Sequence, residues 1–443
     1  MSSKTKSSAT KDEATPALVP KLRFPEFRVA KGWTGEKLGA KTKKVGSGIT
    51  PTGGDKNYKP SGRPFVRSQN IGWGELLLDD VAFIDEETHN SFSSTQIAVY
   101  DVLLNITGAS IGRSVVADSR IEGGNVNQHV CIIRVKPDEL SPFFLNQYLI
   151  SHDGQKQIDS FQAGGNRQGL NFEQIRSFLI PLPAVFAEQQ KIAECLSSVD
   201  ELMAAQARKV DALKTHKKGL MQQLFPREGE TQPRLRFPEF QNVGGWVVKP
   251  LGEVFQITSS KRVHESDWTP TGVPFYRARE IVALSKREPI QPLFISEELY
   301  AAYCKQTGEI REGHLLVTGV GSIGVPYLVK AGDRFYFKDG NIIWLKNEGR
   351  ELSGEFLHRL YETDYVQKQL KAMADVGTVA TYTIDNAKRT LAAFPKDKRE
   401  QQRIATCLSS LDALITAETQ KHEALKTHKK GLMQQLFPSP EEG

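Results

Sequence analysis

The chain contains an internal repeat that runs through most of its length. The hexapeptide Leu-Arg-Phe-Pro-Glu-Phe at residues 22–27 returns at residues 235–240, an offset of 213 positions. A stretch of 15 residues at 212–226 returns without a single change at 424–438. Self-similarity of this kind indicates two copies of one structural unit, so the fold must build the same elements twice.

The two copies are not alike throughout. Residues 40–180 and 253–395 keep only scattered echoes of one another, such as Pro-Phe followed by Val-Arg or Tyr-Arg. Each half therefore holds a divergent globular region followed by a shared segment. We expect the shared parts to face something common to both halves, and the divergent parts to face something different.

The shared segments have the apolar spacing of a coiled coil. From residue 192 and again from residue 404, positions in a strict 4-3-4-3 rhythm are mostly apolar, with polar residues such as Lys217 and Lys429 at some of them. This repeat of about 3.5 residues favours two helices packed on each other. The alternative is two surface helices, each packed on its own domain. The proposed apolar seam consists of Ile192, Leu196, Val199, Met203, Leu213, Leu220 and Leu224, and of Ile404, Leu408, Leu411, Ile415, Leu425, Leu432 and Leu436.

The divergent regions read as mixed α/β. Short apolar runs bounded by Gly and Pro predict strands, and longer runs predict helices at residues 142–151 and 354–373. Each region closes with a proline-bounded strand. The predicted strands cover residues 99–106, 114–117, 130–135 and 178–183 in the first half, and 314–318, 325–329, 342–345 and 391–395 in the second.

Length and composition narrow the class of protein. A chain of 443 residues with 39% hydrophobic side chains suggests two to four globular domains. No apolar run approaches the length of a membrane span, and the Ser/Thr/Lys-rich first 15 residues predict a disordered tail rather than a secretory signal. The four cysteines form no metal or disulfide pattern and fit reduced thiols in the cytoplasm. A net charge of +6 permits nucleic-acid binding.

The sequence carries no recognisable catalytic constellation. A Gly-x-Gly-x-x-Gly pattern at 319–324 matches the dinucleotide fingerprint, which would make the chain a nucleotide-dependent enzyme. That site requires a helix after the glycines, whereas residues 325–329 predict a strand, so the pattern favours a tight turn in a hairpin. Another alternative is a coiled-coil scaffold whose globular ends bind proteins.

Side chains suited to reading nucleic acid recur at corresponding places in both divergent regions. Arg can bond guanine through two hydrogen bonds, Gln or Asn can do the same with adenine, and Lys contacts phosphates. We therefore expect a DNA interface in each half. Its candidates are Arg63, Arg67, Gln69, Asn70, Arg113, Asn127 and Arg167 in the first half, and Lys261, Arg262, Arg277, Arg279 and Lys286 in the second.

From about Leu22 onward the chain resembles the specificity (S) subunits of type I restriction-modification systems. The resemblance rests on the order of motifs: the Phe-Pro-Glu-Phe, Gly-Trp and Leu-Gly opener, a variable region, then Glu-Gln-Gln and the Leu-Lys-Thr-His-Lys-Lys-Gly-Leu-Met-Gln-Gln-Leu-Phe-Pro helix, all repeated. It implies two target-recognition domains, each reading half of a bipartite double-stranded DNA site. It also implies an antiparallel coiled coil that docks two modification (methyltransferase) subunits, and restriction subunits through them.

The resemblance also implies that this chain is not itself an enzyme. S-adenosylmethionine, ATP and magnesium are expected on the partner subunits and no cofactor on this one. The implied division has a tail at 1–21, a target-recognition domain at 22–185, a central helix at 186–226, a second recognition domain at 227–397, a distal helix at 398–438 and a tail at 439–443.

Overall fold

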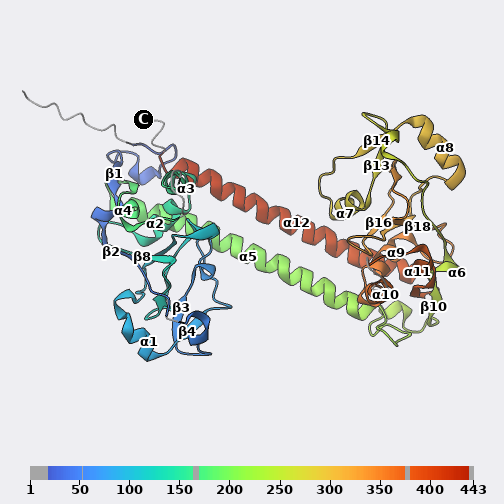
Figure 1. Ribbon diagram of the computed structural model, residues 1–443, viewed down its shortest axis with the longest axis horizontal. Coiled ribbons are helices and arrows are strands. Elements are labelled where there is room, and N and C mark those ends of the chain that lie inside the picture. Colours follow the sequence, from blue (N-terminus) through green and yellow to red (C-terminus); the bar gives the residue numbers. More distant parts are fainter. Residues whose placement is uncertain (1–17, 52, 163–168, 375–379, 439–443) are drawn as a thin grey trace, which may run out of the picture. The chain divides into compact units, whose positions relative to one another are not determined.

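The computed structural model describes residues 18–51, 53–162, 169–374 and 380–438. The chain forms two compact units (Figure 1). The first unit contains Met1–Gln206 and Lys421–Gly443, and the second contains Ala207–Gln420. Each unit therefore combines one globular region with part of each of two long helices.

The long helices are α5 (Phe186–Leu224) and α12 (Lys398–Leu436), each of 39 residues. Within the second unit, Lys209 pairs with Glu418 and Lys217 pairs with Asp412. Because the position on α12 falls as the position on α5 rises, the two helices run antiparallel there. Pairing of Asp200 with Lys429 in the first unit follows the same direction.

The globular region of the first unit is built on three sheets. β1 (Thr34–Lys37) pairs with β9 (Leu179–Leu182). A four-stranded sheet has the order β2 (Thr42–Ser47), β8 (Val130–Val135), β5 (Val102–Asn105) and β6 (Ser114–Val116). A three-stranded sheet has the order β4 (Ala82–Ile84), β3 (Arg63–Val66) and β7 (Asn125–Val126). Only the β3–β7 pair among these strands is parallel.

The globular region of the second unit repeats this topology. β10 (Trp246–Pro250) pairs with β19 (Leu391–Pro395). The larger sheet has the order β11 (Gln256–Thr258), β18 (Ile342–Lys346), β15 (Leu315–Thr318) and β16 (Pro326–Leu328). The smaller has the order β12 (Trp268–Thr269), β14 (Leu293–Ile295), β13 (Val273–Tyr276) and β17 (Tyr336–Phe337), again with one parallel pair, β13–β17. Apart from the additional edge strand β12, two divergent sequences thus form one strand order, and the mixed α/β class is confirmed.

Both regions also contain short helices. The first region has α1 (Glu86–Ser91), α2 (Pro142–Leu149), α3 (His152–Ser160) and α4 (Phe172–Arg176). The second has α6 (Leu251–Val254), α7 (Ala278–Lys286), α8 (Glu297–Thr307), α9 (Gly354–Tyr361), α10 (Asp364–Ala374) and α11 (Ile384–Arg389).

One prediction about these helices is wrong. The helix expected over residues 354–373 is two helices, because Thr363 ends α9 and begins α10. Its hydroxyl donates to the carbonyl of Leu360 at 2.6 Å and accepts from the backbone N–H of Val366 at 3.3 Å. A side chain that bonds the backbone locally in this way competes with helix continuation. In the first region, Ser151 likewise begins α3, which the sequence did not predict.

The glycine pattern at 319–324 lies in a hairpin turn, as predicted. β15 and β16 on either side of it pair antiparallel, with Leu316 opposite Tyr327. Gly321 and Gly324 take positive φ angles of 74° and 79°, which favour glycine. A strand and not a helix follows the glycines, so the pattern lacks the strand–turn–helix order that the dinucleotide fingerprint requires.

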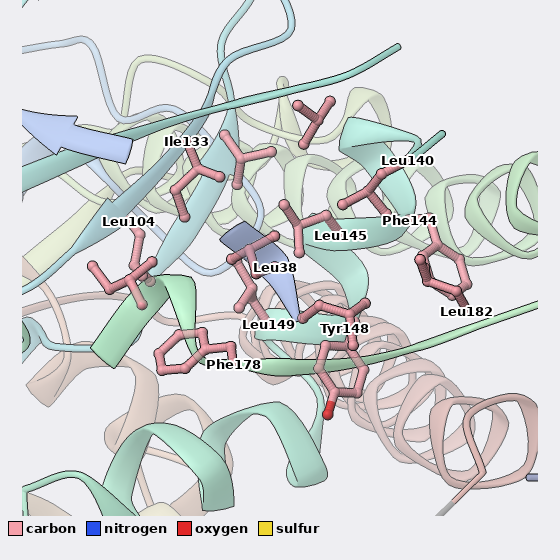
Figure 2. Close-up of a cluster of buried hydrophobic side chains, with 14 of the residues drawn as sticks. Leu38, Leu104, Ile133, Leu140, Phe144, Leu145, Tyr148, Leu149, Phe178 and Leu182 are labelled. Carbon is pink, nitrogen blue, oxygen red and sulfur yellow. The ribbon is translucent and has the colours of Figure 1, made fainter. Parts of the chain in front are cut away.

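The C-terminal end of each long helix belongs to the core of a globular region. In the first unit, α2 lies over the main sheet, and its Phe144 and Tyr148 belong to the buried cluster (Figure 2). Phe437, just past the end of α12, packs on them with ring centroids 5.4 and 5.5 Å apart. In the second unit, Phe225 packs on Phe356 at 5.4 Å. The repeated Leu-Phe-Pro motif therefore has an internal packing role.

Candidate nucleic-acid interface

The first unit gathers polar loops at one end of its sheets. The parallel strands β3 and β7 both end there, at Val66 and Val126. The backbone N–H of Asn127 donates to the carbonyl of Val66 at 3.0 Å. The β5–β6 turn reaches the same end, because the amide of Asn105 donates to the carbonyl of Ser68 at 2.9 Å. We call residues 67–70, 105–113 and 127–129 the first loop edge.

The second unit gathers the corresponding loops at the ends of β13 and β17. The backbone N–H of Lys338 donates to the carbonyl of Tyr276 at 2.8 Å. The β15–β16 turn joins them through Gly319, whose N–H donates to Asn341 at 2.8 Å. The hydroxyl of Ser260 donates to the last residue of β17 at 2.6 Å. We call residues 259–262, 277–280, 319–324 and 338–341 the second loop edge.

A matched tetrapeptide follows β3 and β13. It begins with an arginine, Arg67 or Arg277, whose backbone N–H donates to the side chain of the fourth residue, Asn70 or Glu280, at 2.9 Å in both cases. The third residue is Gln69 in the first edge and Arg279 in the second, and both are exposed. One backbone turn therefore presents different side chains from the two edges.

Asp80 orients the polar side chains of the first tetrapeptide. The Arg67 guanidinium donates to the Asp80 carbonyl at 2.7 Å and lies over the ring of Tyr58, 5.2 Å from its centroid. The amide of Gln69 donates to the Asp80 carboxylate. The Nε of Arg67 is buried and has no hydrogen-bond acceptor. Arg67 is thus held in place while Gln69 remains at the surface.

Glu280 has the corresponding position in the second tetrapeptide. It accepts from Arg277 Nη2 at 2.9 Å and from Arg279 Nε at 2.5 Å. Burial by itself raises the pKa of Glu280, but the hydrogen bonds from these two arginines outweigh burial and hold the pKa below its ordinary value. The carboxylate therefore stays ionised at neutral pH and balances one of the two cations. The side chain of Arg279 remains 70% exposed.

The other predicted cations are divided between the edges and the rest of the surface. Lys261 and Arg262 are exposed on the second edge, where Arg262 pairs with Asp339 at 3.2 Å. Arg113 is half-buried on the first edge. By contrast, Arg63 begins β3 at its opposite end and pairs with Glu86 at 2.7 Å. Lys286 is exposed at the end of α7, outside the second edge.

Two predicted asparagines serve the interior instead. Asn70 is buried, and its amide donates to the Leu77 carbonyl at 2.8 Å. Asn127 is also buried, and its side-chain oxygen accepts from the backbone N–H of His129 at 3.0 Å. Their hydrogen-bonding groups shape the first edge rather than facing outward. Arg167 lies outside the described residues.

The predicted seam positions are turned away from solvent, and those near the helix ends, such as Ile192 and Ile404, pack in the globular cores. Every one of them is buried or half-buried, whereas most other positions on the two helices between Lys191 and Leu220 and between Arg403 and Leu432 are exposed. The seam also contains Lys217 and Lys429, the second of which is only 8% exposed. A lysine at such a position needs a partner, and each has an aspartate on the other helix.

The family model for the type I restriction modification DNA specificity domain matches the chain twice, at residues 46–215 and 243–427. These matches cover more than half of the chain and each copy of the repeat. The chain belongs to this specificity family. The sequence resemblance is thereby confirmed.

Curated relatives of the specificity family share modest identity over most of the chain. A putative type I restriction enzyme MjaX specificity subunit from Methanocaldococcus jannaschii is 21% identical over 398 residues, which cover 86% of this chain and 88% of the relative. The putative specificity subunit S.HindORF215P from Haemophilus influenzae is 25% identical over 295 residues, covering 66% and 70%.

The fold of this chain is similar to the folds of solved structures from type I restriction-modification systems. The type I restriction-modification S subunit from M. genitalium aligns with a TM-score of 0.58 at 17% identity, covering 95% of this chain and all of that one. A chain from a study of complex assembly and conformational transition of the type I R-M system also gives a TM-score of 0.58, at 18% identity, covering 92% of this chain and 98% of that one.

Among the described residues, no helix is long and apolar enough to span a membrane, and no His, Cys, Asp or Glu cluster could hold a metal ion.

Sequence reasoning missed the residues that fasten each long helix of this specificity protein to its globular region. Glu188, near the start of α5, is buried and accepts two hydrogen bonds from Arg23, both at 2.7 Å, and one from the indole of Trp33 at 3.3 Å. Glu400 makes the same contacts with Arg236 and Trp246. All of these residues belong to repeated motifs, and this repetition was the available signal.

Proposed function

We propose that each globular region reads one half of a bipartite double-stranded DNA site through its loop edge. The observation that carries the proposal is the matched tetrapeptide, in which one turn exposes Gln69 in the first copy and Arg279 in the second. Two readers with one architecture and different exposed side chains suit a site whose halves differ in sequence. Lys261 and Arg262 would contact phosphates and position the second edge on the duplex.

The chemistry of these two side chains gives each edge a preferred base. A glutamine amide can donate to and accept from adenine in the major groove, whereas an arginine donates twice to guanine. We therefore assign an adenine contact to Gln69 and a guanine contact to Arg279. Arg67 donates to the carbonyl of Asp80 and Arg277 to the carboxylate of Glu280. These two arginines would hold the turns that carry Gln69 and Arg279 and would not contact the bases.

Replacing Gln69 or Arg279 with alanine tests this assignment. In the complex with the modification subunit, Gln69→Ala should relax one half-site and Arg279→Ala the other, each by about 1–3 kcal/mol of base discrimination. Mapping of methylated adenines in DNA from cells carrying each variant measures both half-sites at once. Relaxation of the same half-site by both variants, or a wild-type site without two halves, would contradict the proposal.

We propose that the exposed face of the repeated helix segment docks the two modification subunits. Internal packing accounts for the identity of buried positions but not of exposed ones. Seven exposed positions of residues 212–226 are nevertheless identical in both copies: Ala212, matched by Ala424, and six polar or charged residues, which suits one partner surface used twice. The six polar or charged residues are Lys214, Thr215, His216, Lys218, Gln222 and Gln223, with Lys426, Thr427, His428, Lys430, Gln434 and Gln435 as counterparts.

Within this proposal the chain contributes recognition and assembly, while S-adenosylmethionine, ATP and magnesium act on partner subunits. Restriction subunits would join through the modification subunits. The target-recognition domains would cover residues 22–185 and 227–397, and the helical segments 186–226 and 398–438. The two compact units divide both long helices, so they do not by themselves define these boundaries.

The long helices are proposed to set the length of the unread spacer. A helix of 39 residues extends about 58 Å at 1.5 Å per residue, more than one DNA turn of about 34 Å. Duplicating residues 202–205 lengthens α5 by about 6 Å, and four added residues unwind a coiled coil only locally. We expect unchanged half-sites separated by one or two more base pairs. Methylated-site mapping decides this, and an unchanged spacer with full activity would contradict it.

A further inference from the structure

Asp200 connects three elements of the first unit. Its carboxylate accepts from Lys429 on α12 at 2.7 and 2.8 Å through its two oxygens. It also accepts from the amide of Gln147 on α2 at 2.9 Å. Asp200 lies on α5, so one side chain joins its own helix, the opposite helix and the globular region.

Asp412 connects the corresponding three elements of the second unit. It lies on α12 and accepts from Lys217 on α5 at 2.7 Å. Its other oxygen accepts from Arg359 on α9 at 2.6 Å. Arg359 in turn pairs with Glu362 at 2.8 Å, which balances the extra cation.

The two sets are related by the internal repeat. Gln147, Asp200 and Lys217 each correspond to the residue 212 positions later, namely Arg359, Asp412 and Lys429. The aspartates and lysines are the same in both copies, whereas the third member lies in the divergent region and has changed from an amide to a guanidinium. Both copies therefore have an aspartate with two partners, although the partner in the globular region differs between them.

Each set lies where sliding one long helix along the other would lower stability. The lysines lie at seam positions, and a charged group there costs stability while specifying one register, because any other register leaves it without its partner. The aspartate that pairs with each lysine also bonds the globular region, through Gln147 on α2 or Arg359 on α9. The globular region must therefore keep its place when the helices keep their register. Register and domain placement are thus coupled at one carboxylate.

We propose that Asp200 and Asp412 are positioning residues that fix each recognition domain on the helix pair and thereby keep the spacer length strict. They contact no DNA in this proposal, so their removal should leave the preferred bases of both half-sites unchanged. The inference rests on the proposed function, because it presupposes two half-sites at a fixed separation.

Asparagine substitutions in the complete complex test the proposal. Asp412→Asn should lower the ratio of methylation at the native spacer to that at spacers one base pair longer or shorter by about tenfold or more, as expected for loss of a charge-assisted hydrogen bond. Asp200→Asn should act in the same direction. Asp211→Asn, which removes an exposed carboxylate from the same helix, is the matched control and should leave the ratio unchanged.

Charge reversal gives a second, sharper test. The Oε1 atom of Gln147 is buried and accepts no hydrogen bond, so it can accept from a lysine at position 200. The double variant Asp200→Lys, Lys429→Asp should therefore regain strict spacing. The double variant Asp412→Lys, Lys217→Asp should not, because the new lysine would face Arg359.

The outcomes separate this inference from the proposed function. If wild-type protein methylates no bipartite site of fixed spacing, the proposed function fails. If it does, and the asparagine variants retain strict spacing, the inference is overturned. Loss of all methylation by a variant that unfolds cooperatively at the wild-type temperature also overturns it, since misplacement should redistribute spacers. If a single variant does not fold, the first charge-reversed variant decides, with relaxed spacing counting against the inference.

Discussion

Replacing Glu400 with leucine is expected to lower the free energy of unfolding of the second unit by about 3–5 kcal/mol. Glu400 is 1% exposed and accepts from Arg236 at 2.8 and 2.6 Å and from Trp246 at 3.2 Å. Leucine leaves the largely buried guanidinium without its counter-charge and the indole N–H without its acceptor. Because these groups hold the start of α12 against the globular region, their loss also loosens the helix.

Urea unfolding of the full chain, followed by circular dichroism, measures this effect. Glu239→Leu is the control, since Glu239 pairs with Arg403 at 3.4 Å with both side chains about half exposed, and such surface pairs contribute at most about 1 kcal/mol. Glu188→Leu should reproduce the large loss in the first unit. Equal stability of Glu400→Leu and Glu239→Leu would refute a stabilising role for the buried pair.

The affinity of the assembled complex for DNA is expected to fall roughly 10³- to 10⁵-fold between about 50 and 200 mM salt, as counterions are released from six to ten neutralised phosphates. The exposed cations of the second loop edge are expected to account for part of this dependence. Replacing both Lys261 and Arg262 with alanine should reduce the slope of log affinity against log salt by about two.

Fluorescence anisotropy with a labelled duplex at several salt concentrations measures the slope. Arg350→Ala is the control, because Arg350 is 82% exposed and follows the C-terminal end of β18, whereas the second loop edge precedes the N-terminal end of that strand. The slope of this variant should match that of the wild type. A Lys261 and Arg262 double variant with the wild-type slope would remove these residues from the interface.

Features with a period or a copy could be predicted from the sequence, whereas features built from distant segments could not. The rhythm from Ile192 onward predicted which positions of the two long helices are shielded from solvent, because helix geometry fixes that relation locally. The role of Glu188 depends on residues more than 150 positions away, and no local pattern gives their distance. The placement of Asn70 failed for a related reason, since an asparagine that shapes a turn and one that contacts a base look alike in sequence.

The insertion of Phe437 into the first core has a consequence for biosynthesis. Translation releases the chain from its N-terminus, so Phe144 and Tyr148 emerge roughly 290 residues before the aromatic ring that packs on them. The core of the first unit therefore stays incomplete until the end of α12 has been synthesised. A polypeptide truncated by a late stop codon would keep both globular regions and α5 but leave that apolar surface open, which favours aggregation or capture by chaperones.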